Sequence, residues 1–170
     1  MVRLHVCFLI FAALATSCAK KEIKGKTKAE VLYKEAISFQ GEERYLMALD
    51  KISSLRSTYP YSFYAIPSEL LRADILFAQE NYIEAADAYL TFRDFHPKHA
   101  KIDYVMWRTA ESYFKELPET IDRDLSSAKD AVVAYREVIS RYPNSRYAKE
   151  AQDRIQKALA LLSDREEYIA

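Results

Sequence analysis

ADILFAQENYIEAADAYLTFRDFHP, residues Ala73 to Pro97, carries the pattern from which the architecture follows. Its apolar residues recur every three or four positions, which is the period of an α-helix, and no run alternates over the length of a strand. Ala73 and Ala85 stand twelve residues apart, and Pro97 follows Ala85 by another twelve. Small residues let two helices approach closely, and proline ends a helix because it cannot donate the next backbone hydrogen bond. The stretch therefore predicts a closely packed helix pair.

The same spacing recurs before and after this stretch. Prolines stand at three corresponding positions, the first two 37 residues apart and the next two 46 apart. An alanine stands twelve residues before each proline, in the pairs Ala48 and Pro60, Ala85 and Pro97, and Ala131 and Pro143. We assign the nine extra residues of the third block to a loop at Leu117–Leu125. Self-similarity at this length is typical of stacked helix pairs.

These patterns predict an all-α helical-repeat solenoid of three helix pairs and a C-terminal capping helix. The repeats are expected at about residues 29–61, 62–98 and 101–143, and the capping helix at 145–168 with Ser145 as its N-cap. The recurring alanines, aromatics and prolines resemble the tetratricopeptide repeat, in which first-helix side chains commonly line a concave groove. The groove candidates are Tyr33, Ile37, Asp74, Phe77, Tyr104, Trp107, Glu111 and Phe114. The alternative is that Trp107, Leu70 and Phe77 belong to the core, since apolar helix stripes usually face inward.

The N-terminal seventeen residues have the layout of a secretory signal: a basic start, an apolar run and small residues at the end. Ala15-Thr16-Ser17-Cys18 resembles the lipobox of bacterial lipoproteins, with Ala15 where leucine is usual. We therefore expect a signal peptide at 1–17, a covalent lipid on Cys18 and a flexible lipidated tether at 18–28. Ala19 in place of aspartate implies, by the same resemblance, sorting to the periplasmic face of the outer membrane. The alternative is an ordinary signal beside a chance cysteine.

Composition and motifs narrow the function classes for the domain at 29–170. Removing residues 1–17 leaves 24 basic against 25 acidic residues, which argues against nucleic acid as the main ligand. We find no phosphate-binding loop, catalytic triad order or remaining cysteine nucleophile, so the sequence predicts neither an enzyme nor a cofactor beyond the lipid. His96 and His99 are interpreted as turn residues rather than metal ligands. Asp122, Arg123 and Asp124 are interpreted as a salt-bridged turn, with a partner-binding loop as the functional alternative.

Two stretches extend the resemblance to a narrower family. HPKHAKIDYVMW (96–107) and DRDLSSAKDAVVAYREVISRYPNSRYAKEAQDRI (122–155) resemble segments of the BamD (YfiO) family of outer-membrane assembly lipoproteins. Members of that family continue with further repeats beyond the point that corresponds to Ala170, and those repeats contact the barrel subunit BamA.

This resemblance implies a lipid-anchored periplasmic scaffold of the β-barrel assembly machinery. The implied partners are a BamA-type barrel assembly protein, other assembly lipoproteins, unfolded outer-membrane proteins and the membrane itself. The groove is expected to hold the aromatic-ended C-terminal segment of an unfolded barrel protein. The alternative is a periplasmic tetratricopeptide adaptor for the cell-wall or cell-division machinery.

Overall fold

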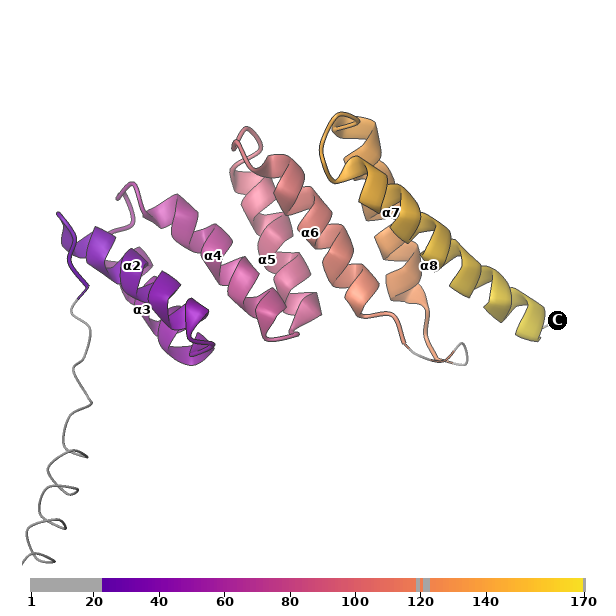
Figure 1. The fold of residues 1–170 in the computed structure, drawn as a ribbon, viewed down its shortest axis with the longest axis horizontal. Helices are drawn as coiled ribbons and strands as arrows, with labels where there is room; N and C mark the ends of the chain where they lie inside the picture. The colour runs from indigo at the N-terminus through magenta and orange to yellow at the C-terminus, as the bar shows by residue number, and fades with distance from the viewer. Residues whose placement is uncertain (1–22, 119, 121–122, 170) are drawn as a thin grey trace, which may run out of the picture.

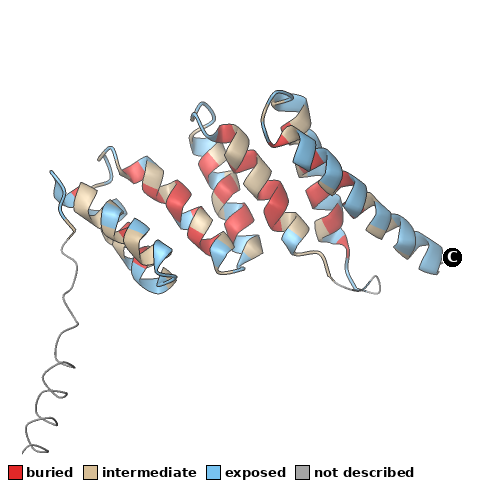
Figure 2. Cartoon of the chain, viewed as in Figure 1, coloured by how far each residue is buried: buried red, intermediate tan, exposed pale blue. Residues whose placement is uncertain are grey.

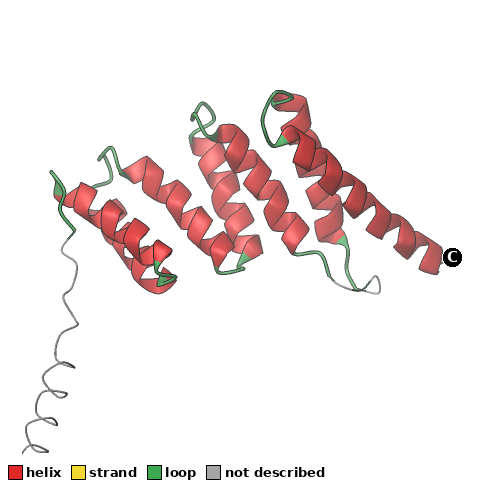
Figure 3. Ribbon diagram, in the orientation of Figure 1, coloured by secondary structure: helices red, strands yellow, loops and turns green. Residues whose placement is uncertain are grey.

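The computed structural model describes residues 23–118, 120 and 123–169, and over these residues the chain contains seven helices and no strand (Figure 3). The helices are α2 (Lys28–Gly41), α3 (Tyr45–Thr58), α4 (Ala65–Ala78), α5 (Tyr82–Phe95), α6 (Ile102–Lys115), α7 (Ser126–Arg141) and α8 (Ala148–Ile169). The predicted all-α class is confirmed. Within the described part of the chain, none of these helices combines the length and the apolar character needed to cross a bilayer.

The helices form a linear stack. Each one packs on the next along the chain, and α2 also contacts α4 while α6 contacts α8. Figure 1 shows the successive pairs lying side by side along the long axis of the molecule. This arrangement confirms the helical-repeat solenoid.

The recurring alanines lie at the centre of the stack. Figure 2 shows buried residues along the sides where helices meet. The alanines of the repeat pattern are all 0% exposed: Ala36, Ala48, Ala73, Ala85, Ala110 and Ala131. Larger residues fill the adjoining space, and Tyr89 and Phe92 of α5 share one buried cluster with Ala73 and Ala85. Close helix approach at alanines, with aromatics beside them, is therefore the packing rule of the fold.

The corners that follow α3, α5 and α7 share one backbone geometry. The residue before each proline donates its N–H to the carbonyl four residues earlier, at 2.8–2.9 Å, from Tyr59 to Leu55, His96 to Phe92 and Tyr142 to Val138. After the third corner, α8 begins at Ala148, so the predicted start at Ser145 is wrong. The Ser145 hydroxyl donates to Asp103 Oδ2 on α6 at 2.7 Å and accepts from the Tyr147 N–H at 3.3 Å. It thus fastens the corner to α6 instead of capping α8.

The turns inside the first two repeats are short and alike. Glu43 and Glu80 stand 37 residues apart and adopt left-handed backbone angles, with φ of 58° and 62°. That conformation closes the helix end, because the next N–H, of Arg44 or Asn81, bonds back five residues. The connection between α6 and α7 is longer, Glu116–Leu125, and lies where the extra residues of the third block were predicted.

Enlarging one of the buried alanines is expected to destabilise the stack. Ala85→Leu adds three carbons at a site with no free volume, which costs about 1–3 kcal/mol of unfolding free energy. Ala160→Leu on α8 is the control, because Ala160 is exposed and a change within about 0.5 kcal/mol is expected there. Urea unfolding followed by helical circular dichroism measures both variants. Equal midpoints would contradict the role assigned to the alanines.

Candidate interaction site

The predicted groove residues lie on the first helix of each pair, α2, α4 and α6, and most are half-buried. Ile37 is the most exposed of them at 44%, whereas Glu111 is only 4% exposed. Asp74, Phe77, Tyr104 and Trp107 come together around one arginine. The other residues lie elsewhere in the stack: Glu111 and Phe114 form a second cluster one repeat on, Tyr33 packs on Tyr64 and Ile37 belongs to neither cluster.

The first cluster is built around the Asp74 carboxylate on α4. Its Oδ1 accepts from the Tyr89 hydroxyl of α5 at 2.6 Å and from the Tyr104 hydroxyl of α6 at 2.7 Å. Arg108 Nε donates to the Tyr104 hydroxyl at 3.0 Å. The Arg108 guanidinium lies 3.9 Å from the centre of the Phe77 ring. One carboxylate therefore joins three helices from two repeats.

The second cluster repeats this arrangement around Glu111 on α6. Its carboxylate accepts from the Tyr135 hydroxyl of α7 and from Arg154 Nε of α8, the latter at 3.0 Å. The Arg154 guanidinium lies 4.8 Å from the centre of the Phe114 ring. We call each set of carboxylate, tyrosine, arginine and aromatic ring an interlock. The Asp74 interlock comprises Asp74, Tyr89, Arg108 and Phe77, with Tyr104; the Glu111 interlock comprises Glu111, Tyr135, Arg154 and Phe114.

The two interlocks occupy the same positions of successive repeats. Tyrosine follows the carboxylate by 15 residues in the first and 24 in the second, a difference equal to the nine-residue insertion. Each carboxylate directly follows a buried repeat alanine, Ala73 or Ala110. At the corresponding positions of the first repeat stand Ile37 and Ile52, which make no such bonds. This shared spacing is visible in the sequence and marks the members of each interlock. The sequence analysis did not assign four of those members to a site: Tyr89, Tyr135, Arg108 and Arg154.

The interlocks change how the predicted groove is understood. The sequence suggested that Asp74 and Glu111 line an open surface. Both carboxylates are engaged in bonds between helices, and Glu111 is buried, whereas Asp74 also lines an open pocket. Burial, followed by the field of Asp74 and its hydrogen bond, raises the pKa of Tyr104 to about 12. Burial and the neighbouring carboxylates raise the pKa values of Tyr89 and Tyr135 still further. These polar groups therefore hold the helices together.

Beside the Asp74 interlock, three aromatic rings pack next to an open pocket, and one of them, Tyr147, is only 7% exposed. The Trp107 and Tyr147 rings stack at 4.6 Å and 16°, and the Tyr104 ring lies about 6 Å from both. The Trp107 indole N–H is buried and has no hydrogen-bond partner among the described residues. An open pocket of about 350 Å³ adjoins these rings, lined by Asp74, Ala100, Lys101, Asp103, Tyr104, Arg146 and Tyr147. Of the predicted groove residues, Asp74 and Tyr104 line this pocket.

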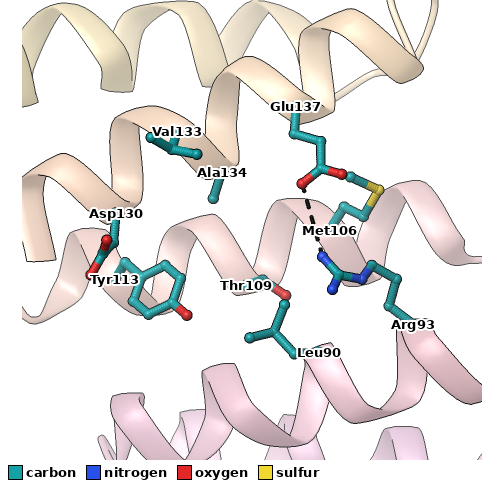
Figure 4. Close-up of a pocket in the computed structure, with 9 residues that line it drawn as sticks. All are labelled: Leu90, Arg93, Met106, Thr109, Tyr113, Asp130, Val133, Ala134 and Glu137. Atoms are coloured by element: carbon teal, nitrogen blue, oxygen red, sulfur yellow. Dashed lines mark ion pairs between the residues drawn. The ribbon is translucent and has the colours of Figure 1, made fainter.

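A second pocket of about 200 Å³ lies between α5, α6 and α7 (Figure 4). Its lining residues are Leu90, Arg93, Met106, Thr109, Tyr113, Asp130, Val133, Ala134 and Glu137. Arg93 and Glu137 bracket one end, with Nη1 and Oε2 3.9 Å apart. Sequence reasoning did not single out this pocket, because its residues come from three helices of two repeats.

The remaining sequence candidates lie in loops or outside the described residues. Cys18 and Asp122 are outside them. The Arg123 carbonyl accepts from Arg165 Nη1 of α8 at 3.0 Å. Asp124 accepts from the Ser126 N–H and hydroxyl, and these bonds lower its pKa. Thus Asp124 orders the start of α7, and its bonds go to serine rather than to an arginine.

The two histidines of the second corner support the turn. His96 Nε2 lies 2.9 Å from Glu69 Oε2, and His99 Nδ1 accepts from the Lys101 N–H at 3.2 Å. Both rings pack on Phe92.

Comparisons with known proteins agree with this architecture. A family model described as YfiO, outer membrane lipoprotein, matches residues 25–170. Three curated proteins, each named outer membrane protein assembly factor BamD, are similar. The one from Neisseria gonorrhoeae is 29% identical over 94% of this chain and 63% of its own length. The one from Neisseria meningitidis serogroup A is 30% identical over 83% and 56%, and the one from Vibrio cholerae 29% over 73% and 55%. The chain thus spans a little over half the length of these relatives.

Removing the buried carboxylate of the second interlock is expected to be costly. Glu111→Ala leaves the Tyr135 hydroxyl and the Arg154 guanidinium without their shared acceptor, which costs about 3–5 kcal/mol of unfolding free energy. Glu150→Ala is the matched control, because Glu150 pairs with the same arginine at 3.5 Å on the surface, where about 0–1 kcal/mol is expected. Chemical unfolding measures both. Equal losses would show that the interlock contributes no more than a surface pair.

The raised tyrosine pKa values predict a loss of stability at alkaline pH. The ordinary tyrosine pKa is 10.0, and the folded values for Tyr89, Tyr104 and Tyr135 lie above it. Their contribution to stability is therefore fully present below pH 10 and is lost as pH rises from about 10 towards 12. Tyrosinate absorbance of the folded chain should show a late-titrating group of tyrosines, reduced by one in Tyr135→Phe. Ionisation of all 13 tyrosines in one early step would contradict this prediction.

Proposed function

The chain belongs to the BamD (YfiO) family of outer membrane lipoproteins, and we propose that it is a lipid-anchored scaffold for the assembly of β-barrel proteins into the outer membrane. The observation that carries this proposal is the family match across residues 25–170, which includes all seven described helices. The names of the curated relatives as assembly factors support a binding role rather than a catalytic one.

The anchor in this proposal is a lipid on Cys18. Thr27 caps α2 by accepting from the Glu30 N–H at 3.1 Å, so the folded stack begins nine residues after Cys18. More than one acyl chain is needed for stable membrane attachment, and the lipobox resemblance implies a multiply acylated cysteine. Such an anchor concentrates the scaffold at the periplasmic face of the outer membrane, where newly exported barrel proteins arrive.

The binding surfaces in this proposal are the aromatic pocket beside the Asp74 interlock and the loop before α7. The half-buried Tyr104 ring and the edge of Tyr147, which stacks on Trp107, line an open pocket that suits an aromatic-ended segment of an unfolded barrel protein. The interlocks keep neighbouring helices at fixed spacing, so this surface is preformed and little ordering entropy opposes binding. A BamA-type barrel assembly protein and other assembly lipoproteins are the proposed partners, with Arg123 and Asp124 as the candidate contact loop.

Membrane fractionation followed by native pull-down from mild detergent tests the proposal. The wild-type chain is expected to sediment with outer membranes and to co-purify with a BamA-type protein. Cys18→Ala should move the chain to the soluble periplasmic fraction. Cys7→Ala is the matched control and should leave it in the membrane, because Cys7 leaves with the signal peptide.

Two results would count against it. Continued sedimentation of Cys18→Ala with membranes would contradict the lipid anchor. A wild-type pull-down without a BamA-type protein would contradict the assembly role, and recovery of peptidoglycan synthases in its place would favour the cell-wall adaptor.

A further inference from the structure

The connections between helices lie along two opposite edges of the stack. The corners at residues 59–64, 96–101 and 142–147 follow one edge, seen along the top of Figure 1, and we call it the corner edge. The connections at residues 42–44, 79–81 and 116–125 follow the other, and their described residues form the turn edge. Helices of 14 residues, about 21 Å long, separate the two edges.

The two edges carry opposite charge. The three loops of the corner edge contain Lys98, Lys101 and Arg146, and the acidic side chains that contact these loops, Glu69 and Asp103, lie on the adjoining helices and bond to His96 and Ser145. The described residues of the turn edge contain five acidic side chains against two basic ones: Glu42, Glu43, Glu80, Glu116 and Asp124 against Arg44 and Arg123. Because the chain as a whole is neutral, this is a segregation of charge and not a surplus. The stack therefore presents a basic side to an anionic surface.

The corner edge also exposes aromatic rings. Tyr61 and Phe63, on the first corner, are 100% and 84% exposed, and Phe95, at the end of α5 beside the second corner, is 76% exposed. The large apolar residues exposed beside the turns of the first two repeats are aliphatic, Leu46, Met47 and Ile83, and the exposed Tyr168 lies at the far end of α8. Aromatic rings beside basic side chains are the combination that prefers the interface between lipid headgroups and acyl chains.

The N-terminal segment reaches the stack at the same edge. The Lys34 ammonium of α2 donates to the Lys24 carbonyl at 3.3 Å, and the Tyr33 ring lies 5.4 Å from that of Tyr64 on the first corner. Lys24, Lys26 and Lys28 are exposed there. Ile23 stands five positions after Cys18, and an extended chain spans at most about 3.6 Å per position, which limits that distance to about 18 Å.

We propose that the corner edge is a second membrane contact, which lays the stack along an anionic bilayer with the Tyr61–Phe63 loop in the headgroup region and the turn edge facing away. The proposal rests on the lipid anchor of the proposed function for its geometry. The favoured occupant is a bilayer rather than a protein, because the exposed rings, the basic loop residues and the anchored segment share one edge, whereas the acidic loop residues lie on the other. An anionic surface attracts each nearby basic side chain, and the attraction fades within about 10 Å, well short of the turn edge.

Site-specific quenching in vesicles tests the orientation. The lipidated full chain retains no native thiol, since Cys7 is removed and Cys18 is acylated, so an introduced cysteine is the only site for a fluorescent label. Tyr61→Cys reports on the corner edge and Glu42→Cys, on the turn edge of the same repeat, is its matched control. Both are reconstituted into phosphatidylcholine vesicles with and without phosphatidylglycerol, with a nitroxide-labelled lipid as quencher.

The label at position 61 is expected to be quenched at least about threefold more strongly than that at position 42, and more so with phosphatidylglycerol. Adding Phe63→Ser or Lys98→Glu with Lys101→Glu should reduce this quenching, whereas Leu46→Ser, an exposed apolar residue near the turn edge, should not. Raising the salt concentration to about 1 M shortens the screening length to about 3 Å. Quenching at position 61 should then fall, as it does in the charge-reversal variant. Unchanged helical circular dichroism in these variants shows that the fold persists.

Equal quenching at the two positions, or quenching at neither, would overturn the proposal and leave the edge to a protein partner. Failure of the lipid anchor has a different signature, because the wild-type chain would then react with the thiol label at Cys18. The unlipidated chain still tests the corner edge by pelleting with phosphatidylglycerol vesicles. Pelleting that Phe63→Ser abolishes and Leu46→Ser preserves would support the contact, and its absence would refute it.

Discussion

Close approach of helices at buried alanines is the constraint on which this structure depends. Ala36, Ala73 and Ala110 on the first helices and their counterparts on the second are wholly buried, so no larger side chain fits without pushing two helices apart. The gaps around these methyl groups are filled by Tyr89, Phe92 and Tyr135. Each helix contacts mainly its neighbours along the chain, and the stack therefore gains stability from one local interface after another.

The interlocks are possible only because of this close spacing. Asp74 reaches hydroxyls on α5 and α6, and Glu111 reaches α7 and α8, because the preceding alanine brings the first helix near. A buried carboxylate has a high desolvation cost, which is offset here by two donors at hydrogen-bond distance and an arginine stacked on an aromatic ring. Packing at alanines alone would let neighbouring helices slide along each other, and these directional bonds fix their relative positions. Fixed relative positions of the helices keep the surface of the stack constant, which suits the scaffold role proposed above.

The fold was predictable because its signals are local, and the site was less so because its contacts are not. Helical period, alanine spacing and prolines lie within single repeats, and they predicted the class and the stacking correctly. The start of α8 was predicted wrongly because Ser145 bonds to Asp103, 42 residues away, which no local pattern reveals. Asp74 and Glu111 were predicted as groove residues. Asp74 does line an open pocket, but the burial of Glu111 was not predictable because Tyr135 and Arg154, which contact it, come from other helices. The one sequence signal for the interlocks was the equal spacing between each carboxylate and its tyrosine, once the nine-residue insertion is subtracted.

The first repeat differs from the others in one respect that affects the mechanics of the whole stack. Where the later repeats place a carboxylate and a tyrosine, it has Ile37 and Ile52. The helices α2 and α3 join α4 through apolar contacts and one partly exposed ion pair, in which Arg56 Nη2 lies 3.2 Å from Glu69 Oε1. Apolar contacts resist separation but tolerate small rotations, whereas a carboxylate held by two donors does not. The joint between the first and second repeats is therefore the softest in the described stack, and it is the joint nearest the proposed tether at residues 18–28. The later repeats can therefore change their tilt relative to the first repeat while their own shape stays constant.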